Sequence, residues 1–593
     1  MSEEKQEEYE EHDASLLVLA GMAILVGCAA GVGSIFFRDL IAFIHNIFFN
    51  ATFSLDYNAN ILEPVGPWGP FIILAPVIGG LVVVWLVNTF APEARGHGVP
   101  EVMYAVFYKR GRIRPIVALV KSLASALSIG SGASVGREGP IIQIGATFGS
   151  TLGRIMRMSV WQTNTLVAAG AGAGIAATFN TPLGGVMFAV EVMLPEVSAR
   201  TFLPVVMATG TAAYIGNLAF GLEPAFLLAP ILTTTRMEPI EGQLLVCAAL
   251  LGVLCGVASW AFVRLLVAFE TLFPKIPGND YSRNAIGMGI VGVMMYLLAV
   301  TYGHYFVGGV GYGTIQAVLL GQMSSIFILS LLCVLKLLAT TISLGSGASG
   351  GIFSPSLFIG ATLGGAFGAV VNNVWRMPEF GVPAFAIIGM AAVVGGSTGA
   401  AMTAVMMIFE MTGDYVLIVP LIVAVGCSVG VRRSLISENI YTMKLARRGV
   451  RIPKERHMNM YLVRQAVEVM NKNILVLPDD TSYERLRDVL NGKPEGTQVI
   501  VSRDGRIRGV VSLRELLQIS ADIPPTIDAL TNRNFLLARE HDILSDILRR
   551  LAQHQRAVVL VARGDQRITR ADDVVGVIDN EQVGDCIVEH YRY

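Results

Sequence analysis

The chain has 593 residues, of which 53% are hydrophobic and only 15% are charged, and its mean hydropathy is +0.59. Soluble domains carry more charge, so this composition excludes an ordinary soluble protein and predicts several membrane spans. The formal net charge of −1, without basic clusters interleaved with aromatic residues, gives no reason to expect a nucleic-acid partner. Residues 1–14 are acidic and lack the basic start of a cleaved signal peptide, so we expect a cytoplasmic tail there.

The first part of the chain, about residues 15–220, is expected to form a series of membrane helices. Two apolar runs, 16–48 and 71–89, are long enough to cross a bilayer. Shorter apolar runs follow at 116–129, 141–155, 166–179, 183–194 and 202–220. Because a crossing needs ~20 residues, we expect several of these helices to end inside the membrane. The basic connection 109–114 predicts a cytoplasmic loop.

Residues 130–140, GSGASVGREGP, separate two of these runs and place Arg137 and Glu138 at membrane depth. Charged side chains are costly there and usually face an ion path or bind a ligand. The glycines and Pro140 favour an irregular segment followed by the first turn of a new helix. The free N–H groups of such a helix end attract anions. The alternative is a kinked buried helix in which Glu138 pairs with Arg137.

The same stretch occurs twice, since residues 345–355, GSGASGGIFSP, lie 215 positions after residues 130–140. This spacing also relates Lys121 to Lys336, residues 144–147 to 359–362, and the tripeptide around His97 to the tripeptide around Tyr312. Matched interrupted segments in two halves of a membrane protein are typical of transporters, whose site lies between the halves. We therefore predict two copies of one membrane unit around a shared site.

The second copy is expected at about residues 242–433. Its apolar runs are 244–272, 285–300, 326–344, 357–371, 385–394, 401–411 and 416–431. The membrane domain is thus predicted over residues 15–440. A basic segment then predicts a cytoplasmic linker over residues 441–460.

Two small α/β units are predicted after the linker, at 461–520 and 526–593. In the first, strands are expected at 474–478, 498–502 and 509–512, with a helix at 483–491. The second repeats the plan, with strands at 534–539, 557–562 and 576–578 and a helix at 544–554. The two units resemble a pair of CBS domains, a module that often binds adenine nucleotides.

The motifs GREGP (136–140), GIFSP (351–355) and GHGVP (96–100) resemble, in this order and spacing, the three anion-site motifs of the CLC chloride channels and transporters. The likeness extends from about residue 15 to Tyr441. It implies an all-α membrane domain of two inverted repeats with broken helices, chloride as the transported ion, a homodimer with one pore per subunit, and cytoplasmic termini.

The resemblance also implies roles for individual residues. Glu138 would be a protonatable gate, supported by the neighbouring motif residues Gly136, Arg137, Gly139 and Pro140. The anion would be bound by His97, Gly98, the main-chain amides of Ile352 and Phe353, and the hydroxyl of Tyr441. The residues with which CBS domains bind nucleotides are only partly matched in this chain, at Ser512, Glu515 and Asp579. A purely structural role of the tail is therefore as plausible as nucleotide sensing.

Two positions depart from the family pattern. His97 stands where the family usually has serine, which suggests an affinity that depends on pH or an altered halide selectivity. Val192 stands where many exchangers of the family have a glutamate that transfers protons, and Glu191 is its acidic neighbour. Valine cannot relay a proton, which favours a passive channel, although waters or Glu191 could substitute.

These observations favour a chloride channel gated by Glu138, with a proton-coupled chloride exchanger as the alternative. A CBS-regulated divalent cation transporter is a distant alternative, because such a site wants several converging carboxylates. We find no nucleophile constellation and no metal-ligand spacing, so we expect neither an enzyme, nor a bound metal, nor a required cofactor.

Overall fold

The computed structural model describes residues 13–221, 224–228, 242–375, 381–450, 452, 460–494, 496–511, 526–554, 558–563 and 570–592. They divide into two compact units. One holds the described residues up to Val106 together with Arg110–Val450, and the other holds Phe107–Lys109 and the described residues from 452 onward. Ser512 and Glu515, two of the predicted nucleotide residues, lie outside the described ranges.

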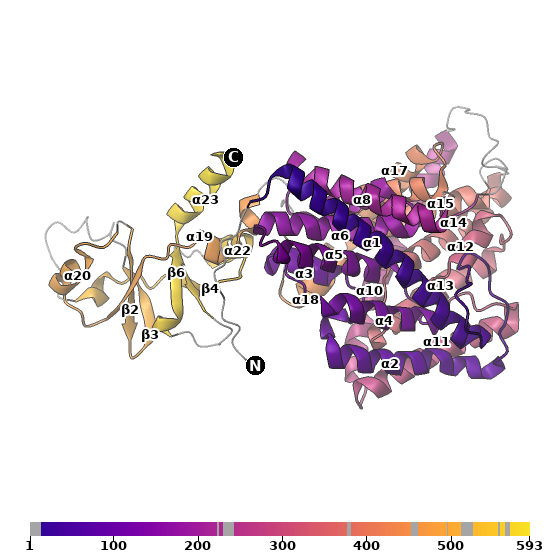
Figure 1. Ribbon diagram of the computed structural model, residues 1–593, viewed down its shortest axis with the longest axis horizontal. Helices are drawn as coiled ribbons and strands as arrows, with labels where there is room; N and C mark the ends of the chain where they lie inside the picture. Colours follow the sequence, from indigo (N-terminus) through magenta and orange to yellow (C-terminus); the bar gives the residue numbers. More distant parts are fainter. Residues whose placement is uncertain are drawn as a thin grey trace. The chain divides into compact units, whose positions relative to one another are not determined.

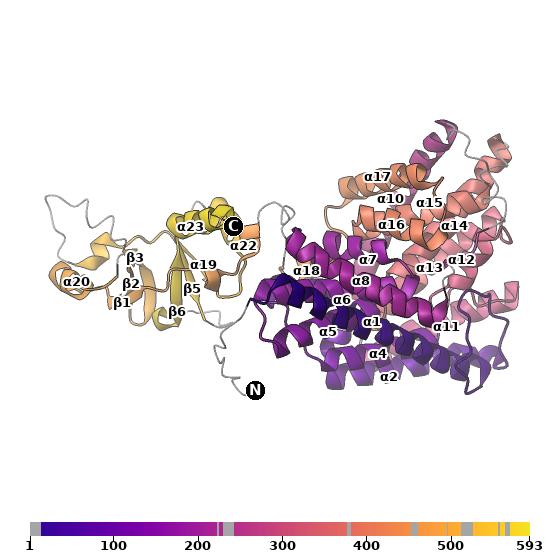
Figure 2. The ribbon, with the colours of Figure 1, turned by 45° about the horizontal axis from the view of Figure 1, so that its top comes forward.

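The membrane unit is entirely helical in its described residues (Figures 1 and 2). Its first half contains α1 (Leu16–His45), α2 (Leu74–Phe90), α3 (Val99–Tyr108), α4 (Ile116–Gly130), α5 (Glu138–Ile155), α6 (Val160–Phe179), α7 (Pro182–Phe188) and α8 (Ala199–Phe220). Its second half contains α10 (Gly242–Leu272), α11 (Asp280–Tyr302), α12 (Tyr312–Leu319), α13 (Ile326–Ser346), α14 (Phe353–Trp375), α15 (Val382–Thr398), α16 (Ala401–Thr412), α17 (Ile418–Leu435) and α18 (Ile440–Arg447).

Eight helices of the described chain are long and apolar enough to cross a membrane, which makes this an integral multi-pass membrane protein. Helix α5 begins at Glu138 and carries Pro140 in its first turn, as the sequence predicts. Two expectations need correction. Helix α12 was not expected, because its eight residues are too short to show a clear period. Part of the predicted linker, at 441–447, instead belongs to α18 of the membrane unit.

The two halves pack in the same way. Helix α5 packs on α6 as α14 packs on α15, α1 packs on α8 as α10 packs on α17, and α2 packs on α4 as α11 packs on α13. The first of these contacts depends on glycine in both halves. A Cβ atom on Gly145 would collide with the carbonyl oxygen of Gly170, and one on Gly360 would collide with that of Gly389. Small residues at such crossings let helices in lipid approach closely.

The duplicated loops meet along a local two-fold axis. The main chains of Gly136 and Gly351, which are 215 positions apart, exchange two N–H···O hydrogen bonds, of 2.7 and 2.6 Å, as an antiparallel pair. The Ser134 amide donates to the Ser343 hydroxyl at 3.2 Å, while the Ser349 amide donates to that of Ser128 at 3.1 Å. Antiparallel pairing of equivalent residues relates the two repeats by a local two-fold axis, in agreement with the predicted inverted repeats.

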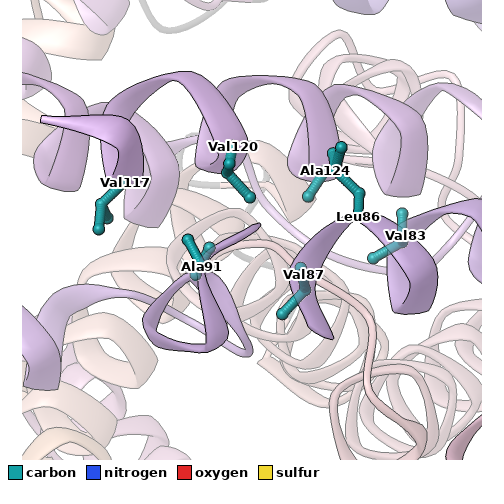
Figure 3. Close-up of a cluster of buried hydrophobic side chains, with 8 residues drawn as sticks. Val83, Leu86, Val87, Ala91, Val117, Val120 and Ala124 are labelled. Atoms are coloured by element: carbon teal, nitrogen blue, oxygen red, sulfur yellow. The ribbon is translucent and has the colours of Figure 1, made fainter. Parts of the chain in front are cut away.

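Aliphatic side chains fill the contact between α2 and α4. Figure 3 shows Val117, Val120 and Ala124 of α4 facing Val83, Leu86 and Val87 of α2, with Ala91 beside them. This contact holds the α2–α3 connection, in which His97 lies, against α4.

The second unit contains two three-stranded sheets of the same design. β1 (Ile474–Pro478) pairs in parallel with β2 (Gln498–Arg503), which pairs antiparallel with β3 (Arg506–Val511). β4 (Phe535–Arg539), β5 (Val558–Ala562) and β6 (Val574–Ile578) repeat this order, and each antiparallel pair has one irregularity in register. The helices α20 (Tyr483–Leu490) and α22 (Leu544–His554) follow the first strand of each sheet. The predicted fold class, helical membrane repeats plus an α/β tail, is confirmed.

Candidate functional site

Glu138 lies in the first turn of α5 and its side chain is fully buried. Its carboxylate reaches the start of α14 in the other repeat. The Ser354 amide donates to Oε2 at 3.2 Å, the Tyr312 hydroxyl donates to Oε1 at 2.5 Å, and the Ser354 hydroxyl also donates to Oε1. The oxygens of this buried carboxyl group are thus satisfied by three hydrogen-bond donors. We call Glu138, Tyr312 and Ser354 the carboxylate site.

Arg137 does not form an ion pair with Glu138 among the described residues. Its guanidinium lies 5.0 Å from the centre of the Tyr312 ring and 5.6 Å from that of Phe179, and it donates to the Thr178 carbonyl at 3.4 Å. The sequence-based alternative of a kinked helix with an Arg137–Glu138 pair is therefore wrong. Arg137 places positive charge near the carboxylate site without neutralising the carboxylate directly.

The N-terminal ends of the helices around the Glu138 carboxylate leave main-chain N–H groups available. Ile352 and Phe353 open α14, and the first N–H groups of a helix have no intrahelical acceptor. Close approach of the loops requires glycine, since a Cβ atom on Gly139 would lie 2.9 Å from the Gly351 Cα atom and would collide with the His97 carbonyl. Pro140 follows in the first turn of α5, where no hydrogen-bonding N–H is needed.

Two equivalent lysines hold the loops that precede α3 and α12. The buried Lys121 ammonium donates to the carbonyls of Ala94 and Gly96 at 2.9 and 2.6 Å, and to the Ser349 hydroxyl at 3.0 Å. Its counterpart Lys336 donates to the carbonyls of Val307 and Gly309 at 3.0 and 2.9 Å. These buried cations fix the irregular backbone that the glycines allow.

His97 lies in the connection between α2 and α3, outside the long apolar spans. Its side chain is buried, and neither ring nitrogen has a hydrogen-bond partner among the described residues. The ring centre is 6.0 Å from that of Tyr441. Burial, followed by the charges of Lys444, Lys121 and Arg448, holds the pKa of the imidazole well below its usual value. Gly98 beside it has φ of +78°, which favours glycine.

Tyr441 is brought to this place by α18. Asn439 caps that helix by accepting hydrogen bonds from the amides of Tyr441 and Thr442 at 2.9 and 2.8 Å. Glu101 of α3 ties α18 down through Arg448 at 2.8 Å and Lys444 at 3.6 Å. The Tyr441 side chain is buried against His97, so the predicted anion residues from opposite ends of the membrane unit are adjacent.

Glu191 occupies a structural position. Its carboxylate accepts hydrogen bonds from the amides of Met402 and Thr403, at 3.3 and 2.9 Å, and from the Thr403 hydroxyl at 2.8 Å. In the same way Glu410 accepts from the amides of Leu183 and Gly184 at 3.0 and 2.7 Å. Each glutamate thus caps the short helix of the other repeat. Val192 is buried beside Glu191 and offers no titratable group.

Asp579 of the second unit also makes local contacts. Its side chain accepts from the Glu581 amide at 2.7 Å, near the start of α23 (Asn580–Arg592), and from Gln498 at 3.3 Å. These contacts are those of a helix cap, which accounts for the residue without a nucleotide.

Fold and site together define a membrane transport protein in which a buried carboxylate lies among the N-terminal ends of helices from two inverted repeats. Residues 79–433, more than half of the chain, match the family described as voltage gated chloride channel, and residues 466–522 match the CBS domain. The chain belongs to this CLC family of anion transport proteins, with a CBS region after the membrane domain.

Relatives and solved structures agree with this assignment. The H(+)/Cl(−) exchange transporters ClcA of Salmonella typhi and Salmonella typhimurium are each 29% identical to this chain over 442 residues, covering 74% of the chain and 90% of the relative. The structure of a slow cyanobacterial Cl−/H+ antiporter is similar with a TM-score of 0.63 and 26% identity, covering 74% of this chain and 99% of that one. A eukaryotic CLC transporter shares the fold, with a TM-score of 0.58 at 20% identity, over 96% of this chain and 98% of that one.

Sequence reasoning missed two members of the carboxylate site, Tyr312 and Ser354. A signal for them was present, because Tyr312 is the counterpart of His97 and Ser354 is the counterpart of Gly139 at the 215-residue spacing.

Proposed function

We propose that the chain exchanges chloride for protons, and that Glu138 alternates between binding a proton and occupying the anion path. The observation that carries this proposal is the buried Glu138 carboxylate held by the Ser354 amide and by the hydroxyls of Ser354 and Tyr312. Such donors suit a halide as well as a carboxylate, so the two compete for one place. Relatives named as H+/Cl− exchangers support this reading over a channel.

The proposed anion path uses uncharged donors. His97 contributes a ring N–H, Tyr441 its hydroxyl, and Gly98, Ile352 and Phe353 their main-chain amides. A halide bound only by dipoles can leave again, whereas a direct ion pair would hold it more tightly. Protonation of Glu138 cancels its attraction to the donors at the start of α14, the side chain leaves, and chloride enters. Departure of the anion lets the carboxylate return and release its proton.

The reversal potential in liposomes tests the proposal. Purified protein under opposed chloride and proton gradients is expected to reverse at a potential displaced from the chloride Nernst value. Glu138→Gln cannot ionise, so its flux is expected to continue without proton coupling and to reverse at the chloride value. A wild-type reversal at the chloride value would exclude exchange, and loss of all flux in correctly folded Glu138→Gln would exclude the competing role of Glu138.

A passive chloride channel is the second candidate, and one observation favours it. Val192 has no proton to transfer, and the Glu191 carboxylate accepts three hydrogen bonds from α16. On this alternative Glu138 takes its proton from one side only and serves as a gate. The same reversal measurement separates the two candidates. The family assignment removes the basis for a divalent cation transporter.

We further propose, on the family likeness, a homodimer with one pore per subunit and cytoplasmic termini. An adenine nucleotide at the CBS region is a weaker proposal, because Asp579 already caps α23 and the other two residues lie outside the described ranges.

A further inference from the structure

Tyr312 is held rigidly against the gate. The residue opens α12 and its side chain is 2% exposed. Its ring packs edge-on against Phe226 and Phe179, at centroid distances of 5.6 and 6.3 Å. The hydroxyl lies 2.5 Å from Glu138 Oε1 and 2.7 Å from Ser354 Oγ. Because the aromatic neighbours fix the ring, the hydroxyl has little freedom to follow the carboxylate if Glu138 moves.

Tyr312 is also the repeat equivalent of His97. Both follow a glycine with positive φ, +78° for Gly96 and +80° for Gly311. Both loops are held by the equivalent lysines Lys121 and Lys336. Each repeat therefore presents one polar aromatic ring at the same place. The His97 ring faces Tyr441, whereas the Tyr312 hydroxyl contacts the proposed gate, Glu138.

We propose that Tyr312 is a positioning residue that holds ionised Glu138 at the start of α14 and thereby sets the pH at which the gate opens. This inference rests on the proposed function of Glu138. A hydrogen bond from a hydroxyl to an ionised carboxylate is stronger than one between neutral groups. Protonation of Glu138 weakens that bond, so the Tyr312 hydroxyl favours the closed, ionised state over the open one.

Tyr312 lines a pocket of about 50 Å³, together with His45, Tyr57, Glu63 and Tyr305. The His45 imidazole lies against the Glu63 carboxylate in this pocket. The charged and titratable groups that face Tyr312 and Glu138 are Arg137 beside the ring, Lys336 behind the loop, the His45–Glu63 pair in the pocket, and Tyr441 on the other side. Removing one uncharged hydroxyl leaves all these charges in place.

The test is the pH profile of chloride flux in proteoliposomes for Tyr312→Phe. We expect the pH of half-maximal flux to rise by about one unit, the usual effect of losing one hydrogen bond to a charged group. Tyr305→Phe is the matched control. Its hydroxyl lies in the same pocket but accepts from the Gly66 amide at 3.0 Å, so its profile should match the wild type. An unchanged profile in Tyr312→Phe, or an equal shift in Tyr305→Phe, overturns the proposal.

Two further measurements separate this role from a structural one. In the Glu138→Gln background, Tyr312→Phe should add no shift, since the carboxylate on which it acts is gone; a shift that persists there overturns the proposal. If Tyr312→Phe does not fold, 3-fluorotyrosine at position 312 keeps the shape and donates a stronger hydrogen bond, so the midpoint should fall instead. A midpoint that rises or stays unchanged contradicts the proposal.

The wild-type profile separates failure of this inference from failure of the proposed gate. A wild-type flux that does not depend on pH overturns both. A wild-type flux that depends on pH, with the same profile in Tyr312→Phe, overturns this inference alone.

Discussion

The imidazole of His97 is buried without a partner for either nitrogen among the described residues, next to the ring of Tyr441. A buried polar group without a partner is costly, so this position is suited to a ligand that arrives from outside the chain. The three nearby cations, Lys444, Lys121 and Arg448, disfavour another positive charge on the ring and keep its pKa low. We therefore propose that His97 acts as a neutral donor, which favours an effect on halide selectivity over an effect on pH dependence.

His97→Ser tests this assignment. Since burial and the nearby cations hold the imidazole pKa well below its usual value, we expect the ring to be neutral near pH 7, and the variant should keep the wild-type pH profile there. The shorter serine changes the distance from donor to halide, so the relative permeability of bromide, nitrate and chloride should change several-fold. Reversal potentials under mixed-anion gradients measure these relative permeabilities. A profile that flattens in His97→Ser would show that the ring titrates after all.

At the level of helices, short elements are stabilised by partners from the other repeat. Helices α7 and α16 are too short to be stable alone. Glu410 of α16 accepts from the first amides of α7, and Glu191, in the segment that follows α7, accepts from those of α16. The α5–α6 and α14–α15 pairs add a second device, in which facing glycines bring two backbones together. These contacts hold the helix starts near the carboxylate site in fixed positions.

Gly145→Ala tests the glycine contact. The added Cβ atom would collide with the Gly170 carbonyl, so α5 and α6 must separate. We expect a loss of about 1–3 kcal/mol in stability, the usual cost of overpacking, seen as a lower midpoint of thermal unfolding in detergent. Gly210→Ala on α8 is the control, because nothing lies within 4 Å of its added atom. Equal midpoints for the two variants would contradict the packing argument.

Much of the helical framework could be predicted from apolar runs and from the 215-residue spacing, because both are local or repetitive signals. The contact between Tyr312 and Glu138 could not, since it joins residues 174 positions apart and depends on the packing of α12 on α14. The contacts of Glu191 could not be predicted from the sequence either. Its sequence neighbour suggested a proton path, but the amides that it caps belong to α16, whose position depends on the whole repeat pair.

At the scale of the whole molecule, the residues proposed to form the anion path all lie in the membrane unit. They include His97 and Glu138 in the first repeat and Tyr441 near the C-terminal end of the unit. The second unit forms its own two sheets with their own buried side chains. Transport and any regulation by the tail are thus assigned to separate units of the chain.

A chain that ends at Val450 should therefore retain transport. We expect chloride flux and its pH midpoint in liposomes to remain within about twofold and a few tenths of a pH unit of the full chain, since no site residue is removed. Size-exclusion chromatography in detergent serves as the folding control. Loss of flux in a monodisperse truncated protein would show that the tail is needed to form the site.

The hydrogen bonds between Gly136 and Gly351 involve main-chain atoms alone, so the pairing does not depend on which side chains flank it. The residues beside these glycines can therefore differ between the two repeats without loss of the pairing. One repeat carries Glu138, whereas the other carries the Tyr312 and Ser354 hydroxyls that donate to it. Such a difference between the repeats requires a contact that is independent of the flanking side chains, and the main-chain hydrogen bonds of two glycines provide it.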